Sequence, residues 1–189
     1  MSTLKRCTGV IPTQVGIQGI LQWKWHEKYN SRITMTPAIN LVKKKKISHT
    51  VHQYHHAPGS ESYGKEAAEK LGINEKRVFK TLVVQTDDGT LAVAVIPVSS
   101  MLSMKMIAKA RGAKKAAMAG KNLVEKATGY VLGGVSPLGQ KKRLPTVIDL
   151  SAEKFSAIFV SGGRRGLDIE LAPSDLAALT SATFHELCS

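Results

Sequence analysis

Apolar and polar residues after position 35 follow the periods of both helices and strands. Thr36 and Pro37 are typical of a helix start, because threonine caps the first turn and proline fits its first position. Further helices are predicted over Ser60–Gly72, with Ser60 or Ser62 as the cap, over Met101–Arg111 and Ala113–Ala127, and from Pro173 onward. Strands are predicted over His49–Tyr54, Val78–Thr86, Leu91–Val98, Tyr130–Leu132, Thr146–Leu150, Ala157–Val160, Leu167–Leu171 and Ala182–Leu187.

These helices and strands intermingle without a strict alternation. We therefore expect an α+β fold, a single domain around a mixed, mostly antiparallel sheet. The strongest local signal is Asp87-Asp88-Gly89-Thr90 between two apolar runs, since Asp-Gly favours a tight hairpin turn. A second turn is expected over Ser161–Gly166.

Residues 1–34 show no sustained period, because proline and glycine interrupt their short apolar stretches. Pro12, Gln14 and Gln18 also break the continuous apolar centre that a signal peptide needs. We expect residues 1–34 to be an N-terminal extension that is disordered or arises from an upstream start or an added tail. Residues 35–189 would then form the folded domain.

The net charge of the chain indicates what kind of partner it binds. It carries 27 lysines and arginines against 14 acidic residues, a net charge of +13, of which +4 lies in residues 1–34 and +9 in residues 35–189. This excess predicts an anionic partner, with nucleic acid the leading candidate. The dense runs are Lys43–Lys46, Lys114-Lys115, Lys141–Arg143 and Arg164-Arg165. Each run alone is more simply a solvated surface, so binding requires that they converge.

Composition also excludes some classes of protein. No apolar run approaches the roughly 18 residues of a membrane-spanning helix, so we expect no membrane association and a cytoplasmic protein. The two cysteines, Cys7 and Cys188, lie near opposite ends, which excludes a disulfide scaffold and a cysteine-rich zinc module. Neither cysteine is placed as a catalytic thiol.

One cation stands inside an apolar strand. Alternation puts Lys80 on the face of Val78, Leu82 and Val84. A lysine there is costly unless its amine reaches water or a partner. It is either a snorkelling side chain or a pocket cation that binds a phosphate or polarises an ester oxygen.

Two glycine-rich segments could approach a ligand closely. Gly133–Gly139 holds three glycines and a proline but lacks the Gly-Lys-Ser/Thr ending of a P-loop. Ser161–Gly166 adds two arginines. Each segment can be an ordinary turn, or the two can pair into a mouth that holds an anionic ligand.

Metal and nucleophile chemistry find little support in the sequence. His52, Tyr54 and His56 would share one strand face. No His-Glu-x-x-His motif is present and no cysteine or carboxylate lies near them in sequence, so hydrogen-bonding pocket lining is favoured over a metal site. No Gly-x-Ser-x-Gly elbow is present. Asp168 and Glu170 share a strand face, yet the nearby Arg164 and Arg165 could simply pair with them. An enzyme built this way would work by positioning and electrostatics, without a cofactor or metal.

Taken together, the segments resemble the YbaK group of aminoacyl-tRNA editing deacylases over about residues 35–189. The resemblance rests on Met35-Thr36-Pro37-Ala38, the strand of Tyr54, Val78-Phe79-Lys80-Thr81-Leu82, the loop Gly133–Gly139 and the segment Ser161–Leu171. The group's fold is one α+β domain around a mixed sheet, related to the editing insertion of bacterial prolyl-tRNA synthetase.

The resemblance implies roles for particular residues. The group's essential lysine falls on Lys80, which would hold and polarise the aminoacyl ester. Its glycine loop falls on Gly133 and Pro137, and Tyr54 matches its pocket tyrosine. Further pocket members by this resemblance are Thr81, Gly134, Ser136, Ser161, Gly162 and Asp168.

The resemblance also implies substrate and partners. The match is nearest to bacterial deacylases that clear Cys-tRNA(Pro), and also Cys-tRNA(Cys), in trans beside prolyl-tRNA synthetase. The substrate's own thiol is thought to attack its ester and leave as a thiolactone, so no protein nucleophile is needed. Two alternatives stay open: a deacylase for another mischarged amino acid, and a non-catalytic RNA-binding domain.

Overall fold

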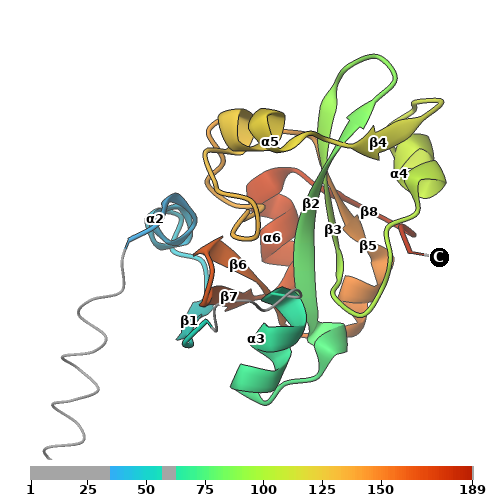
Figure 1. Ribbon diagram of the computed structural model, residues 1–189. Coiled ribbons are helices and arrows are strands. Elements are labelled where there is room, and N and C mark those ends of the chain that lie inside the picture. Colours follow the sequence, from blue (N-terminus) through green and yellow to red (C-terminus); the bar gives the residue numbers. More distant parts are fainter. Residues whose placement is uncertain (1–34, 57–62, 189) are drawn as a thin grey trace, which may run out of the picture. The chain divides into compact units, whose positions relative to one another are not determined.

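The computed structural model describes residues 35–56 and 63–188. The predicted N-terminal extension, Cys7 and the predicted helix caps Ser60 and Ser62 lie outside the described residues. Within the described part, an eight-stranded mixed sheet has the strand order β1-β7-β6-β2-β3-β5-β8, and β4 pairs with β2 (Figure 1). The strands are β1 (His49–Gln53), β2 (Val78–Thr86), β3 (Leu91–Pro97), β4 (Ala116–Met118), β5 (Thr146–Asp149), β6 (Ile158–Arg164), β7 (Leu167–Leu171) and β8 (Thr183–His185).

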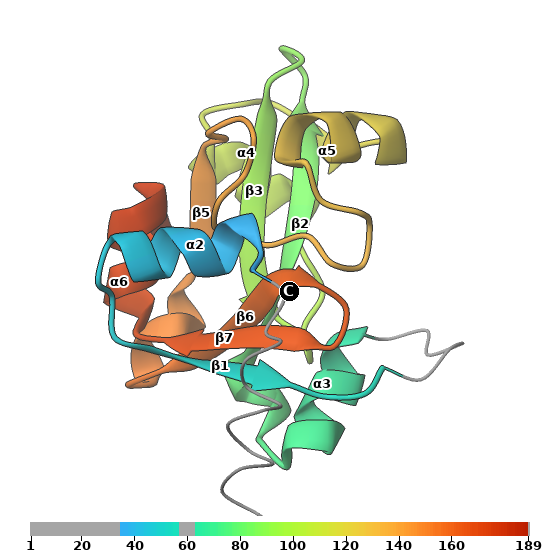
Figure 2. The same cartoon turned by 90° about the vertical axis from the view of Figure 1, so that its left-hand side faces the viewer.

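Helices cover both faces of this sheet. They are α2 (Pro37–Lys44), α3 (Tyr63–Leu71), α4 (Met104–Ala110), α5 (Lys121–Thr128) and α6 (Pro173–Thr180), with the short 3-10 helices η1 (Glu75–Arg77) and η2 (Leu150–Lys154). In Figure 2, α2, α5 and α6 lie on the near side of β2, β3 and β5, and α4 lies behind these strands. The α+β class and the mixed sheet predicted from the sequence are confirmed, with four antiparallel and three parallel strand pairs.

The first described helix begins as its sequence predicts. Thr36 caps α2, and its hydroxyl accepts a hydrogen bond from the Ile39 amide at 3.2 Å. Pro37 occupies the first turn, where its missing N–H costs nothing. Ala38, Ile39 and Val42 are fully buried, so α2 is held by its apolar face.

The hairpin β2–β3 is also as predicted. The Asp-Gly turn joins the two strands, and Gly89 has a φ of +82°, a conformation that a residue with a side chain rarely adopts. Beyond this turn the prediction of a helix over Ala113–Ala127 is wrong for its first part and confirmed from Lys121 onward. Ala116–Met118 forms β4 on the edge of β2, and α5 begins only at Lys121.

Asp87 explains the difference at β4. Its carboxylate accepts hydrogen bonds from the Lys114 and Lys115 amides at 3.2 and 3.4 Å, and its own amide donates to the Lys115 carbonyl. These bonds hold the alanine- and lysine-rich segment in an extended conformation beside β2, so tertiary pairing overrides its helix propensity.

Two smaller predictions also need correction. Tyr130–Leu132 is a turn in place of a strand, and the Tyr130 hydroxyl donates to the Leu138 carbonyl at 2.7 Å. Ser161–Gly166 is only partly a turn, because β6 continues through Arg164 with a bulge opposite β7.

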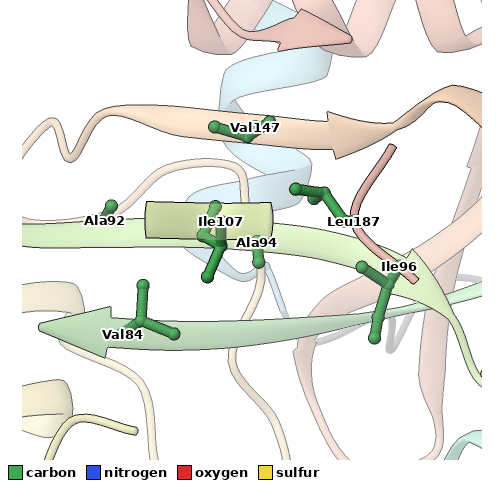
Figure 3. Close-up of a cluster of buried hydrophobic side chains, with 7 residues drawn as sticks. All are labelled: Val84, Ala92, Ala94, Ile96, Ile107, Val147 and Leu187. Atoms are coloured by element: carbon green, nitrogen blue, oxygen red, sulfur yellow. The ribbon is translucent and has the colours of Figure 1, made fainter. Parts of the chain in front are cut away.

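Two apolar clusters cover one face of the sheet. The α4 cluster packs Ile107 of α4 against Val84, Ala92, Ala94, Ile96, Val147 and Leu187 (Figure 3). The α3 cluster joins Ala67 and Ala68 of α3 to Val78, Val98 and Phe159. We call this side of the sheet the α3–α4 face. Among the described residues, no helix is both long and apolar enough to cross a bilayer.

Candidate functional site

Lys80 lies between the two apolar clusters of the α3–α4 face. Its strand neighbours at two-residue spacing are Val78, which belongs to the α3 cluster, and Leu82, which packs against the α4 cluster. The predicted face of Lys80 is therefore confirmed. Its Nζ lies 3.5 Å from the Val98 carbonyl oxygen, and burial lowers the pKa of the Lys80 amine.

Strands β2 and β6 separate directly beside Lys80. Their parallel pairing consists of Val78 with Phe159 and Phe79 with Val160. Lys80 and Ser161 are the next residues along the two strands, and both lie on the α3–α4 face by alternation. The opening between parallel strands thus presents an ammonium and a hydroxyl on the same side.

Asp168 and Tyr54 join the same face. Asp168 lies directly opposite Ser161 on one side and opposite His52 on the other, and paired residues of adjacent strands point to one side of a sheet. Tyr54 packs against the α3 cluster. The structure therefore brings Lys80, Tyr54, Ser161 and Asp168 onto one face.

Tyr54 and Asp168 interact directly. The Tyr54 hydroxyl and the Asp168 carboxylate, which is 6% exposed, interact electrostatically, and among the described residues the buried Oδ2 of Asp168 has no hydrogen-bond partner. Burial raises the pKa of Asp168 to about 7, although the neighbouring Tyr54 hydroxyl works in the opposite direction. Burial and the nearby carboxylate raise the pKa of Tyr54 above its ordinary value. Asp168 can therefore exchange a proton near neutral pH.

The two glycine-rich segments adjoin each other. A Cβ on Gly134 would lie 3.0 Å from the Arg164 Cα, and one on Gly163 would lie 2.6 Å from the Tyr130 ring. Gly133 has a φ of +89°, and the neighbouring Ser136 is fully buried. At both positions other atoms of the protein pack against the glycine backbone at distances that leave no room for a side chain.

Three other predicted residues lie apart from the Lys80 side. Thr81 belongs to the opposite face of β2, and its buried Oγ1 lacks a hydrogen-bond partner. Gly162 accepts a hydrogen bond from the Thr36 hydroxyl through its carbonyl at 2.5 Å. Pro137 lines a pocket of about 520 Å³ with residues of α2 and α6, including Leu41 and Leu179.

The histidines beside Tyr54, which the sequence predicts as hydrogen-bonding pocket lining, pair with carboxylates. Glu170 pairs with His52 at 2.9 Å and with Arg77 at 3.0 Å, so the suggested pairing of Glu170 with Arg164 or Arg165 is replaced by these contacts. Buried Glu66 of α3 pairs with His56 at 2.6 Å. Within residues 35–56 and 63–188, no group of three or more potential ligands could hold a metal ion.

Cys188 has neighbours that the sequence does not predict. The sequence places it near the end of the chain, away from any motif, yet its thiol interacts electrostatically with Lys80. Burial, followed by the neighbouring Asp149, raises the pKa of Cys188 to about 11. No local signal predicts this contact, because it depends on how β8 and the following residues return to the sheet.

Comparison with known proteins agrees with the family resemblance seen in the sequence. The family model of the aminoacyl-tRNA editing domain matches residues 57–179. A protein of Enterococcus faecalis named "Putative Cys-tRNA(Pro)/Cys-tRNA(Cys) deacylase EbsC" is 41% identical over 153 residues, which cover 80% of this chain and 92% of that protein.

Solved structures agree with the fold. A "putative trans-editing enzyme for prolyl tRNA synthetase" superposes with a TM-score of 0.69 at 23% identity, covering 82% of this chain and 99% of that one. The "hypothetical protein APE2540" superposes with a TM-score of 0.73 at 25% identity, covering 82% and 100% of the two chains. The chain therefore belongs to the aminoacyl-tRNA editing domain family, as its sequence motifs predict.

Proposed function

We propose that this protein is a trans-editing deacylase that removes cysteine from Cys-tRNA(Pro), with Cys-tRNA(Cys) as a second substrate. One observation carries the proposal: Lys80, Tyr54, Ser161 and Asp168 share the α3–α4 face where β2 and β6 separate. The name of the Enterococcus relative supports this choice of substrates.

Lys80 is the electrostatic centre of the proposed site. Its ammonium stands on an apolar strand face, where an interaction with a developing negative charge is worth more than in water. We assign it to the ester of the aminoacyl-tRNA, where it holds and polarises an oxygen. Tyr54, Ser161 and Asp168 would line the pocket for the cysteinyl group.

The substrate supplies the nucleophile in this proposal. The cysteinyl sulfur attacks its own ester carbonyl, a carbon–sulfur bond forms, and the bond to the ribose oxygen breaks. The tRNA hydroxyl leaves with a proton, and water then opens the thiolactone to free cysteine. This route selects cysteine by reactivity, whereas a pocket alone separates side chains by only about 1–3 kcal/mol per methylene-sized difference.

The two adjoining glycine-rich segments would receive the 3′ end of the tRNA. Close packing of Gly134 against the Arg164 backbone holds the two segments side by side. In this proposal, backbone N–H groups of the segments contact ribose and phosphate. Exposed Lys141, Lys142 and Arg165 border these segments in the chain and would bind phosphates. We assign the choice of tRNA(Pro) to a cytoplasmic partner, prolyl-tRNA synthetase, because phosphate contacts alone carry no sequence information.

Deacylation of purified tRNAs tests the proposal. The protein is expected to release cysteine from Cys-tRNA(Pro) and to act at least 100-fold more slowly on Ala-tRNA(Pro), which lacks the thiol. Lys80→Ala should lower release about 100- to 1000-fold, whereas Lys76→Ala, a change at an exposed lysine of η1, should leave it unchanged. Turnover of Ala-tRNA(Pro) at the cysteinyl rate would contradict the substrate-thiol route.

A binding assay separates the enzyme from a non-catalytic RNA-binding domain. Binding of tRNA that weakens steeply with salt, without release of any amino acid across a panel of mischarged tRNAs, would favour the second function. Adding prolyl-tRNA synthetase to the same panel tests the partner, because an unchanged preference among tRNAs would count against it.

A further inference from the structure

The pocket of about 520 Å³ between α2 and α6 lies on the side of the sheet opposite to α4 (Figure 2). We call it the α2–α6 pocket. Leu41 of α2 and Leu179 of α6 contribute to its apolar lining, and Pro137 and Gly139 of the glycine-rich segment complete one wall. Pockets of about 300–1000 Å³ commonly bind drug-sized groups, so this one is large enough for a single nucleotide.

Two of the basic runs in the sequence meet at this pocket. Lys45 belongs to the run Lys43–Lys46 and Arg143 to the run Lys141–Arg143, and both side chains line the pocket although they are far apart in the chain. Among the described residues that line it, none is acidic. The convergence that nucleic-acid binding requires of these runs is therefore present at the α2–α6 pocket.

The helix ends beside the pocket oppose anion binding only weakly. Both α2 and α6 approach it with their C-terminal turns, and each such end carries about half a negative charge. The two basic runs contribute four and three positive charges, which outweigh these ends. The Arg143 guanidinium also donates to the hydroxyl of Ser181, the C-cap of α6, which holds this cation at the end of the helix.

Two threonines in the lining have already used their only donor. The Thr146 hydroxyl donates to the Leu144 carbonyl at 3.1 Å, and the Thr180 hydroxyl donates to the Leu176 carbonyl at 2.7 Å. Because a hydroxyl has one hydrogen, these two oxygens can only accept further bonds. A matching ligand group must therefore donate, as the exocyclic amino group of cytosine does, whereas uracil presents a carbonyl oxygen there.

We infer that the α2–α6 pocket binds one of the two cytidines in the CCA end of a tRNA. Lys45 and Arg143 contact the phosphates beside this nucleotide, the leucine side chains pack against the base, and the threonine oxygens accept bonds from its amino group. The inference rests on the proposed function, which makes aminoacyl-tRNA the ligand. Since Pro137 and Gly139 belong to the glycine-rich segment that receives the terminal adenosine, the preceding nucleotide lies along the same segment.

An acidic protein segment fits the pocket less well than RNA does. Its carboxylates would satisfy Lys45 and Arg143, but ionised carboxylates only accept hydrogen bonds. They would leave the oxygens of Thr146 and Thr180 without a donor. A nucleotide offers an anion for the cations and a donor for the threonines in one ligand.

Binding of uncharged tRNA tests the inference without any chemical step. Two tRNA(Pro) transcripts, one ending in CCA and the other in UUA, are compared by fluorescence anisotropy with the full chain. The CCA form should bind about 10-fold more tightly, because the uracil carbonyl would face oxygens that cannot donate. Equal dissociation constants for the two transcripts would overturn the inference.

Ala178→Trp fills the pocket from an exposed position of α6, so the protein should still fold. It should weaken binding of the CCA form to the level of the UUA form. Ala117→Trp, at an exposed position of β4, is the matched control and should keep the difference. An Ala178→Trp protein that still prefers CCA would contradict the inference.

Arg143→Ala tests the phosphate contact. It should weaken binding of both transcripts alike and lower the slope of log Kd against log salt by about one. Lys114→Ala, at an exposed lysine of a basic run outside the pocket, should leave the slope unchanged. An equal fall of the slope in both variants would assign the effect to overall charge and count against the pocket.

The outcomes separate the pocket from the proposed function. A preference for CCA that Ala178→Trp removes, in a protein that deacylates no tRNA, supports the pocket and refutes the deacylase. Release of cysteine by a protein that binds both transcripts equally supports the deacylase and refutes the pocket. Binding of a hexaglutamate peptide that Ala178→Trp abolishes, with tRNA binding unchanged, would assign the pocket to an acidic protein segment and overturn the inference.

Discussion

The two apolar clusters of the α3–α4 face differ in what surrounds them. The α4 cluster consists of aliphatic side chains from α4, β2, β3 and β5 and of Leu187, which follows β8, and its seven central residues are fully buried. The α3 cluster is bordered by the ionisable pairs Tyr54–Asp168 and His52–Glu170. The α4 cluster is a packed apolar core that contributes stability, whereas ionisable side chains adjoin the α3 cluster, and Lys80 lies between the two clusters.

Ile107→Ala tests how much the α4 cluster contributes to stability. Removal of this fully buried side chain leaves a cavity under α4 and should lower the free energy of unfolding by about 2–5 kcal/mol. Urea unfolding measures the loss. Met101→Ala, at a side chain that is 72% exposed, is the control and should change it little. A comparable loss of stability in both variants would contradict the view that the α4 cluster is a packed core.

Lys80→Met tests the role of the cation that lies between the two clusters. Its apolar side chain fits between the clusters, so the free energy of unfolding should stay constant or rise. Deacylation should fall about 100- to 1000-fold, the typical cost of removing one electrostatic contact to the reacting ester. Single-turnover assays measure the rate, with Lys76→Met as the matched control. An active Lys80→Met enzyme would place the chemistry elsewhere.

Asp168, one of the ionisable residues beside the α3 cluster, should make the stability of the protein depend on pH. Because its pKa is raised to about 7, the folded state keeps a proton that the unfolded state loses near pH 4. Stability from this group is therefore present below pH 4 and declines as pH rises to 7, by at most about 1.4 kcal/mol per pH unit. Unfolding curves of Asp168→Asn and the natural protein should converge at low pH. Parallel curves across pH 4–7 would refute the buried, protonated state.

Arg77→Lys should have the smallest effect. The guanidinium donates to the Ala157 carbonyl and to Glu170, and it lies 5.1 Å from the centre of the Phe159 ring. Lysine keeps the charge but loses the planar fork, so stability should fall by about 1 kcal/mol. Thermal unfolding measures this change, and Lys76→Arg beside it should be neutral. A neutral Arg77→Lys would show that charge alone matters here.

The parts of the fold that sequence predicts well are those set by local patterns. The strand Val78–Thr86, the turn at Gly89 and the cap at Thr36 each follow from a few adjacent residues. The segment 113–120 was predicted wrongly because its composition favours a helix, whereas the deciding partner is the carboxylate of Asp87 in a preceding turn. The spacing of apolar residues within a segment does not reveal a hydrogen-bond partner that is far away in sequence.

The candidate site divides in the same way. Strand alternation identifies Lys80 as exceptional, and the motifs identify Tyr54 and Asp168. The link between Tyr54 and Asp168 requires β1 to pair with β7, which no spacing in the chain reveals. Cys188 was set aside because nothing near it is distinctive, and only the pairing of β8 with β5 brings it to the sheet.

The contacts of Leu187 and Cys188 with residues 102 and 103 also have a consequence for the order in which the protein folds. Ser103 caps α4 and bonds to Leu187, and Leu102 bridges Cys188, although these partners are far apart in sequence. Contacts across such separations form late, because the entropy of closing a long loop is lost before any bond compensates it. The hairpin β2–β3 can form early and present Lys80 to water. The lysine would acquire its buried surroundings only in the final step of folding, so catalytic competence should report on completion of the native state.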